Sequence, residues 1–301
     1  MGDSELVEGR FQQLLPAELM GKLERMELVS RKIFRGRMKG ERRSPRKGQS
    51  VEFADFRNYT PGDDLRFIDW NLYARLDRLY LKLFLEEEDL HFFGLIDNSL
   101  SMSFGQPSKL EAAKRLMAAL GYIGLCRGDR IVVQGHSQAS RPAKAHRSRA
   151  SLPQLLDQID RIQPEATPSF REAVQSFCIR NPGRGIVVWV TDLMDKSGYE
   201  SAMRLLMARR MDLYVIHLLS PEELQPQATG DLRLTDCEDG DQREVSITPG
   251  LLARYQERLG AFLEGAKNFC QRRTISYLPA RSDLAVDRLV NDYLRQRGLV
   301  R

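Results

Sequence analysis

The segment FFGLIDNSLSMSFG, residues 92–105, places an aspartate directly after an apolar run and then a serine at every second position. In an extended loop alternate residues point the same way, so Asp97, Ser99 and Ser101 can converge on one point. Carboxylates and hydroxyls are hard oxygen ligands, which suit Mg²⁺ or Mn²⁺. The segment therefore indicates a divalent-cation site, and the alternative is a polar turn that caps the next helix.

A second apolar run, IVVWVTD, ends in Asp192, and Thr167 lies between the two acids in the chain, just before an expected helix. Ligand sites of parallel sheets lie at the carboxyl ends of their strands. If the strands at 90–96 and 185–192 are both central and parallel, the two aspartates emerge on the same rim. Asp192 and Thr167 therefore join the candidate ligands.

Strand and helix patterns alternate from residue 90 onward, which predicts an α/β fold with a mainly parallel sheet covered by helices on both faces. The segment 137–146 is expected to be a short edge strand, because Pro142 suits an edge and not a sheet centre. Residues 233–247 predict a hairpin that turns at Asp239-Gly240. The expected strands of the sheet cover 90–96, 129–136, 185–192, 211–219 and 274–279, and the expected helices cover 109–126, 150–161, 169–180, 199–210, 250–271 and 284–296.

Residues 16–30 have apolar side chains at helical spacing, which predicts a first helix there. A basic segment follows at 31–47 with nine Lys or Arg and one acid. Such a segment can meet phosphates or an acidic protein. Few aromatic residues interleave with its charges, so nucleic acid ranks below both an acidic protein partner and a solvated arm. Further on, residues 78–88 alternate apolar and polar side chains and predict a half-buried strand.

The segment TPGDDLRFIDW, residues 60–70, has two interpretations. In the structural one, Thr60 caps a short helix, Pro61 takes its first position and Asp63 returns the capping bond. Capping and ion-pair roles are commoner than interface roles for such residues, so the structural interpretation is preferred. The alternative is a partner-binding surface made by Asp63, Asp64, Arg66 and Asp69.

Two resemblances narrow these expectations. The pattern Asp97-x-Ser99-x-Ser101, followed by Thr167 and Asp192, resembles the metal-ion-dependent adhesion site of von Willebrand factor A domains. The segment GQSVEFADFRNYTPGDDLRFIDWNLYARLDRLYLKLF resembles the signature of the bacterial "domain of unknown function 58" family, whose members often accompany MoxR-type AAA+ ATPases. This resemblance covers about residues 30–220.

The resemblance implies a von Willebrand factor A-like, doubly wound sheet of six strands with one antiparallel edge strand and the metal at its top. The domains would then be an N-terminal helical and basic extension at 1–78, which packs on the main domain, and the A-like domain at 79–301. A partner's Asp or Glu would complete the shell of the ion. The ligands that hold Mg²⁺ or Mn²⁺ directly or through water would be Asp97, Ser99, Ser101, Thr167 and Asp192.

The function expected from these features is a metal-dependent protein-interaction or adaptor module, not an enzyme. By resemblance, it would work with an AAA+ ATPase on an acidic-residue-bearing client, in the assembly or maturation of other proteins. The chain has no G-x-x-x-x-G-K-[ST] and no G-x-S-x-G. An aspartate after a strand is also the phosphoryl acceptor of some α/β phosphatases, but these usually carry a second acid where this chain has Ser99. An aspartate-dependent phosphotransferase or phosphatase, and a nucleic-acid binder through residues 31–47, are the alternatives.

Bulk properties fit a cytoplasmic protein. No uninterrupted apolar run approaches the roughly 18–20 residues that span a bilayer, and the N-terminus has early acids and no apolar core, unlike a signal peptide. The four cysteines form no C-x-x-C pair, which favours reduced thiols over disulfides or zinc.

Overall fold

The computed structural model describes residues 9, 11–29, 52–85, 90–136, 143–166, 168–209 and 211–301. The chain forms two units, a larger one made of Met1–Ser30 with Leu90–Arg301, and a smaller one made of Arg31–Asp89. This division differs from the expected boundary at residues 78 and 79. The reason is strand pairing, because the strand that begins at Tyr80 pairs within the smaller unit.

The smaller unit contains an antiparallel pair, β1 (Glu52–Asn58) and β2 (Tyr80–Leu85), and β2 is the half-buried strand expected in this region. A 3₁₀ turn, η1 (Leu65–Phe67), and helix α4 (Trp70–Leu76) lie between the two strands. The helix expected to begin at Thr60 is not there. Gly62 has φ of +107°, which breaks a right-handed helix, so Thr60 and Asp63 close a turn instead.

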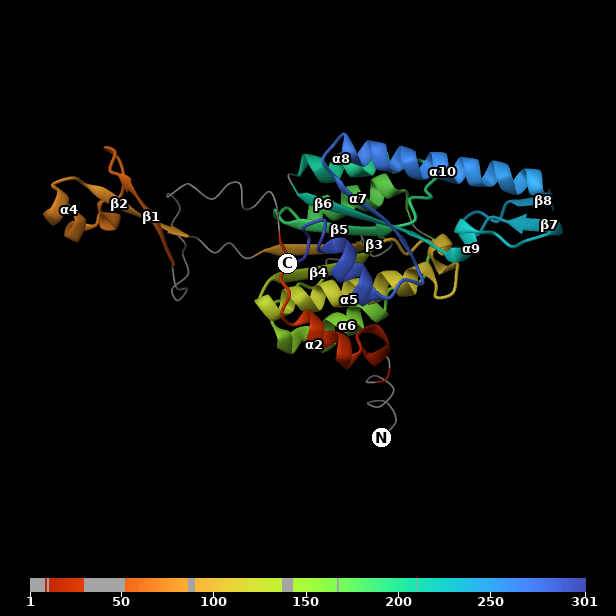
Figure 1. Cartoon of the computed structure of the whole chain (residues 1–301), viewed down its shortest axis with the longest axis horizontal. Helices are drawn as coiled ribbons and strands as arrows, with labels where there is room; N and C mark the ends of the chain where they lie inside the picture. Colours follow the sequence, from red (N-terminus) through yellow and green to blue (C-terminus); the bar gives the residue numbers. More distant parts are fainter. Residues whose placement is uncertain are drawn as a thin grey trace. The chain divides into compact units, whose positions relative to one another are not determined.

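Five parallel strands form the sheet of the larger unit, in the order β4-β3-β5-β6-β9 (Figure 1). Each strand lies within two residues of a strand expected from the sequence. The central strands β3, β5 and β6 are almost wholly buried, as the continuous apolar runs predict for a sheet covered on both faces. The bounds are β3 (His91–Ile96), β4 (Arg130–Gly135), β5 (Ile186–Thr191), β6 (Asp212–Leu219) and β9 (Ser276–Arg281).

The expectation of a six-stranded sheet with an antiparallel edge strand is not confirmed. Among the described residues, the sheet has five strands, all parallel. At the β4 edge, His146 forms a single antiparallel bridge with Ile131, with both N–H···O distances at 2.8 Å. A 3₁₀ turn, η4 (Arg149–Ser151), begins three residues later and ends the pairing. Residues 137–142, where the edge strand was expected to begin, lie outside the described residues.

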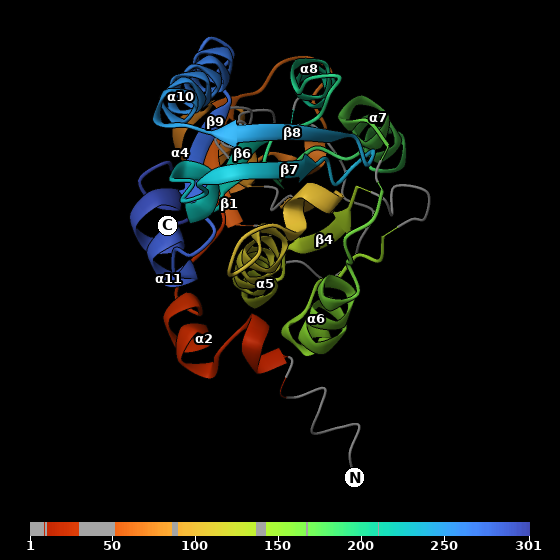
Figure 2. The same ribbon diagram turned by 90° about the vertical axis from the view of Figure 1, so that its right-hand side faces the viewer.

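Helices cover both faces of the sheet, as expected (Figures 1 and 2). The helix expected at 16–30 is shorter, and the one expected at 284–296 is a short turn followed by π-helix. On one face lie α2 (Ala17–Leu23), α5 (Lys109–Arg127), α6 (Leu152–Asp160) and α11 (Val286–Arg288) with η5 (Leu289–Leu294), and on the other α7 (Phe170–Arg180), α8 (Glu200–Ala208) and α10 (Pro249–Gln271).

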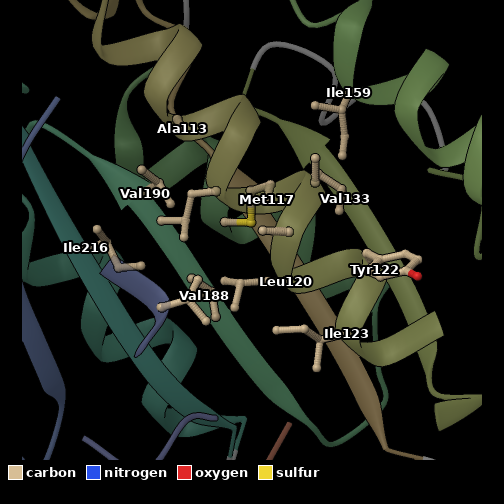
Figure 3. Packing of buried hydrophobic residues seen from close by; sticks show 14 of the residues in the cluster. Ala113, Met117, Leu120, Tyr122, Ile123, Val133, Ile159, Val188, Val190 and Ile216 are labelled. Atoms are coloured by element: carbon tan, nitrogen blue, oxygen red, sulfur yellow. The ribbon is translucent and has the colours of Figure 1, made fainter. Parts of the chain in front are cut away.

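Helix α5 lies centrally in its layer (Figure 2), and 14 of its 19 residues are buried. Figure 3 shows Met117 and Leu120 of α5 directed toward Val188 and Val190 of β5. The helix comes close to β3, because a Cβ on Gly94 would lie 2.8 Å from the sulfur of Met117. Lys109, the first residue of α5, lies at the carboxyl edge of the sheet, where it pairs with Asp192.

A two-stranded hairpin, β7 (Gly230–Thr235) and β8 (Gln242–Ile247), follows β6 and the short helix α9 (Pro221–Leu224). The expected turn at Asp239-Gly240 is confirmed, with Gly240 at φ +78°. The hairpin is not part of the main sheet, and Figure 2 shows it lying across the carboxyl edge of the parallel strands. No helix among the described residues is both long and apolar enough to cross a membrane, and all four cysteines are free thiols.

Candidate metal centre

Asp97 lies directly after β3 and is completely buried. Its backbone N–H still bonds to the carbonyl of Val190 at 2.9 Å, so the residue remains in register with β5. One carboxylate oxygen accepts a hydrogen bond from the Thr191 hydroxyl at 2.6 Å, and the other accepts one from the Ser99 N–H at 3.0 Å. The carboxylate is therefore held in one orientation by groups from two strand ends.

The two serines after Asp97 lie side by side. The Oγ atoms of Ser99 and Ser101 are 3.0 Å apart, which is a hydrogen bond. Ser99 is buried and Ser101 is partly exposed, so the pair leads from the buried carboxylate toward solvent. Asn98 holds this loop through two hydrogen bonds. Its side-chain amide donates to the backbone carbonyl of Gln163 at 2.7 Å, and its backbone carbonyl accepts from the N–H of Glu165 at 2.9 Å.

A buried histidine lies on the other side of Asp97. The indole N–H of Trp189 donates to Nε2 of His136 at 2.9 Å, so Nε2 carries a lone pair. Burial lowers the pKa of His136 to about 3, so the ring is neutral and its proton is on Nδ1. Nδ1 lies 3.5 Å from the Asp97 carboxylate without a hydrogen bond, and the neutral ring brings no positive charge to that carboxylate.

Asp192 directly follows β5 and is paired with a buried lysine. Nζ of Lys109 lies 2.8 Å from one carboxylate oxygen of Asp192 and 2.5 Å from a carboxylate oxygen of Glu223. The N–H of Met194 donates to the other oxygen of Asp192 at 3.0 Å. The Lys109 side chain is 0% exposed and that of Asp192 is 1% exposed, so the pair is shielded from water.

The two aspartates differ in their protonation equilibria. Burial, followed by the charge of Asp192, raises the pKa of Asp97 to about 7. Burial also opposes ionisation of Asp192, but the charge and hydrogen bond of Lys109 outweigh it and lower the pKa of that carboxyl. The nearby Ser101 hydroxyl lowers it further. Ser101 thus brings the loop after β3 close to the carboxylate after β5.

The charge of this cluster is unbalanced when all its carboxylates are ionised. Asp97, Asp192 and Glu223 carry three negative charges and Lys109 carries one positive charge, which leaves two negative charges in a buried site. A divalent cation matches that excess, and the carboxylate and hydroxyl oxygens match the preference of Mg²⁺ or Mn²⁺. In the described parts of the chain, no three His, Cys, Asp or Glu side chains form a metal-binding group by themselves. A metal donor set at this edge would therefore have to include the serine hydroxyls.

Four of the five predicted ligands converge on this edge of the sheet, namely Asp97, Ser99, Ser101 and Asp192. Thr167 lies outside the described residues. The helix that follows it, α7, is tied to the Asp192 loop, because the N–H of Phe170 donates to the Asp195 carboxylate at 2.7 Å.

The residues of the alternative partner surface have structural roles in the smaller unit. Asp63 pairs with Arg57 at 2.6 Å, and that bond is the main cause that holds the pKa of Asp63 well below its usual range. Asp64 pairs with Arg66 at 2.5 Å. Asp69 caps α4 by accepting from two backbone N–H groups and pairs with Lys82 at 3.0 Å. These contacts match the capping and ion-pair roles of the structural interpretation, although the helix expected to begin at Thr60 is absent.

Sequence reasoning missed several residues of the site. Thr191 is the last residue of β5 and directly precedes Asp192, so its place at the end of the strand was a usable signal for it. His136 follows β4 at the same edge of the sheet, which was a weaker signal. The pairing of Lys109 with Asp192 and Glu223 joins residues 83 and 114 positions apart, and no local pattern marks it.

Three curated proteins are similar to this chain, one from Mycobacterium bovis and two from strains of Mycobacterium tuberculosis, each described as an uncharacterized protein. Each is 27% identical over 243 residues, covering 78% of this chain and 75% of the relative. A solved structure of an aerotolerance-related membrane protein from Bacteroides fragilis matches with a TM-score of 0.37 and 16% identity, over 69% of this chain and 99% of that one. That likeness is too distant to carry a conclusion.

A family model described as "Protein of unknown function DUF58" matches residues 55–261. The match spans more than half of the chain and includes most of the segment that carries the sequence resemblance. It also includes Asp97, Asp192 and the loops around them. The chain therefore belongs to the DUF58 family.

Proposed function

We propose that this chain is a metal-dependent protein-binding module that takes Mg²⁺ or Mn²⁺ at the carboxyl edge of its sheet. The proposed ligands are Asp97, Ser99, Ser101 and Asp192, with Thr167 as a further candidate. The ion would offer an open coordination position, where the carboxylate of an acidic partner segment could bind.

One observation carries the proposal. Two carboxylates from neighbouring strands, Asp97 and Asp192, are buried at one edge, and the single buried lysine beside them leaves their cluster with excess negative charge. Burying unpaired charge is costly, so such an arrangement favours binding of a cation. Because Ser101 is partly exposed while both aspartates are buried, an ion would be reached from solvent past the serine hydroxyls.

The enzymatic alternative has less support. The acid that usually lies two residues after a phosphoryl-accepting aspartate is replaced here by Ser99, whose N–H donates to the Asp97 carboxylate instead. Incubation with acetyl phosphate followed by mass spectrometry tests this directly. An acid-stable, base-labile phosphate on Asp97 would show that the site transfers a phosphoryl group, and the enzymatic function would then replace the proposed binding function. The nucleic-acid alternative rests on residues 31–47, which lie outside the described residues.

Metal binding itself is tested by Mn²⁺ titration followed by electron paramagnetic resonance. The wild-type chain is expected to bind one Mn²⁺ that Mg²⁺ displaces, and Asp97→Asn is expected to bind at least ten-fold more weakly. Asp283→Asn is the matched control, because Asp283 forms an exposed pair with Arg281 at 2.5 Å outside the site. Equal binding by wild type and Asp97→Asn would remove the proposed site.

The partner is tested by affinity capture from cell extract in Mg²⁺ and in EDTA. A partner held by wild type in Mg²⁺, and lost in EDTA and with Asp97→Ala, identifies what the module binds. We propose an AAA+ ATPase of the MoxR type as one such partner on the family resemblance, and a cytoplasmic role in the assembly or maturation of other proteins. Partners that ignore both EDTA and the substitution would exclude this edge as their binding site.

A further inference from the structure

The turn of the β7–β8 hairpin lies over the candidate metal centre. Residues 236–241, called the acidic tip below, have the sequence DCEDGD, with four acids in six residues. Figure 2 shows the hairpin crossing the carboxyl edge of the sheet, where the loops after β3 and β5 emerge. The acidic tip is therefore a segment of this chain with the chemistry that the proposed function assigns to a partner.

The acidic tip contacts both loops of the centre. The backbone N–H of Ser101 donates to a carboxylate oxygen of Glu238 at 2.9 Å. On the other loop, the ammonium of Lys196 lies 3.2 Å from a carboxylate oxygen of Asp236 and also pairs with Asp239. Ser101 is one of the proposed ligands, and Lys196 lies four residues after Asp192. Glu238 thus places a carboxylate against the exposed side of the ligand loop.

The strands of the hairpin are held to each other rather than to the sheet. Their side chains are mostly exposed, and cross-strand pairs such as Arg233 with Glu244 and Asp231 with Ser246 are internal to the hairpin. None of its residues belongs to the two hydrophobic clusters of the described chain. The tip contacts are therefore what join the hairpin to the candidate metal centre.

These contacts suit a reversible attachment. Lys196 is 67% exposed, and ion pairs between exposed side chains are weak. A tethered segment nevertheless acts at a high effective concentration, so weak contacts are enough to keep it in place. A partner that offers a carboxylate to the same position would have to compete with the tip.

We propose that the acidic tip is an internal ligand of the metal centre, bound where the carboxylate of a partner binds, and that it leaves before a partner can bind. The proposal rests on the proposed function and adds its regulation. The Ser101 N–H and the Lys196 ammonium bind the carboxylates of an acidic segment, which comes either from the hairpin or from another protein.

The test removes the tip and returns it as a separate peptide. Thr235 pairs with Gln242, so replacing residues 236–241 by Asn-Gly leaves a two-residue turn and both strands intact. The probe is a fluorescent peptide of residues 232–245 with Cys237→Ser. In Mn²⁺ it is expected to bind the trimmed chain at least ten-fold more tightly than the wild type, whose own tip occupies the position.

Matched peptides identify the group that is recognised. The peptide with Glu238→Gln is expected to bind the trimmed chain at least ten-fold more weakly, while the one with Glu244→Gln binds unchanged. Equal binding of the unaltered peptide to both chains, or binding to neither, would overturn the proposal. If both chains bind Mn²⁺ in that case, the proposed function stands without the internal ligand. If neither binds Mn²⁺ and the trimmed chain still takes the peptide, the tip contact stands and the metal site falls.

Discussion

A single lysine makes two neighbouring carboxylates behave differently. Lys109 holds Asp192 ionised through a 2.8 Å contact, whereas Asp97 accepts hydrogen bonds from two neutral donors, the Thr191 hydroxyl and the Ser99 N–H. The pKa of Asp97 is raised to about 7 by burial and by the charge of Asp192. A bound cation would therefore stabilise the ionised form of Asp97 most, whereas the ionised form of Asp192 depends on Lys109.

Removing the lysine charge should expose that dependence. Lys109→Met leaves the buried carboxylate of Asp192 and the partly buried one of Glu223 without their cation, and removal of one partner from a buried pair typically costs about 3–5 kcal/mol. We expect a loss of that size in the free energy of unfolding, measured by urea denaturation in EDTA. Mn²⁺ should restore part of it, because a cation replaces the missing charge. Lys267→Met is the matched control, since Lys267 pairs with Glu264 at the surface, and a loss below about 1 kcal/mol for Lys109→Met would contradict the account.

His217 should make stability depend on pH. Burial lowers its pKa to about 4, and Nδ1 forms a 2.7 Å hydrogen bond with the Tyr277 hydroxyl. Below the unfolded pKa of about 6.5 the unfolded chain takes up a proton that the folded chain refuses, so stability is lost as the pH falls from about 6.5 to about 4. His217→Gln should flatten the curve of unfolding free energy against pH by about 1.4 kcal/mol per unit in that window, in urea titrations with EDTA. Parallel curves would show that His217 is not responsible.

At the scale of elements, the site exists because β3 and β5 are adjacent and parallel. Phe92 pairs with Ile186 and Ile96 with Val190, so the two strands end together and release Asp97 and Asp192 at one edge. The start of this pairing needs a very close approach of the backbones. A Cβ at Gly185 would overlap the carbonyl oxygen of His91, which is backbone and cannot turn aside.

Gly185→Ala should therefore disturb the whole β3–β5 pairing. Overpacking typically costs about 1–3 kcal/mol, and a clash with backbone places this variant at the upper end of that range. The measurement is the urea midpoint, with Mn²⁺ affinity as a second readout, because a shifted strand also moves an aspartate. Gly250→Ala is the matched control, since a Cβ there meets nothing within 4 Å. Equal midpoints for the two variants would show that the strands can separate at little cost.

The parts of the fold that the sequence predicts are those set by local periodicity. The apolar runs that end in Asp97 and Asp192 identified two adjacent strands, and the Asp239-Gly240 signal identified the hairpin turn. The helix expected at Thr60 was wrong because Gly62 has a positive φ, which breaks a right-handed helix. A glycine can take either sign of φ, so the residue type alone does not decide whether a helix continues through it. Lys109 was not predicted as part of the site, because its role depends on how close α5 packs to the sheet. That approach is set by Gly94 and Met117, which are far apart in sequence.

At the scale of the whole molecule, the local charge of the carboxyl edge opposes the charge of the chain. The chain carries a net charge of +5, yet the centre holds two excess negative charges when Asp97 is ionised, and the acidic tip adds four acids above it. A local field of this kind attracts cations regardless of the overall sign. Lys109 and Lys196 are the positive groups paired with these acids in the described chain, and each is already shared between two carboxylates.

Binding of a divalent cation should therefore stabilise the folded chain as a whole. A ligand that binds only the folded state adds about 2.7 kcal/mol at a concentration of 100 times its Kd. We therefore expect Mn²⁺ to raise the urea midpoint of the wild type at pH 8, where Asp97 is ionised because the pH lies above its pKa of about 7. At pH 6 the increase in the midpoint should be smaller. Asp97→Asn should lose this response without losing metal-free stability, because the substitution removes a buried charge rather than a paired one. A midpoint that Mn²⁺ leaves unchanged in the wild type would mean that Lys109 alone balances the charge of the two aspartates. The carboxyl edge would then be a structural ion-pair cluster.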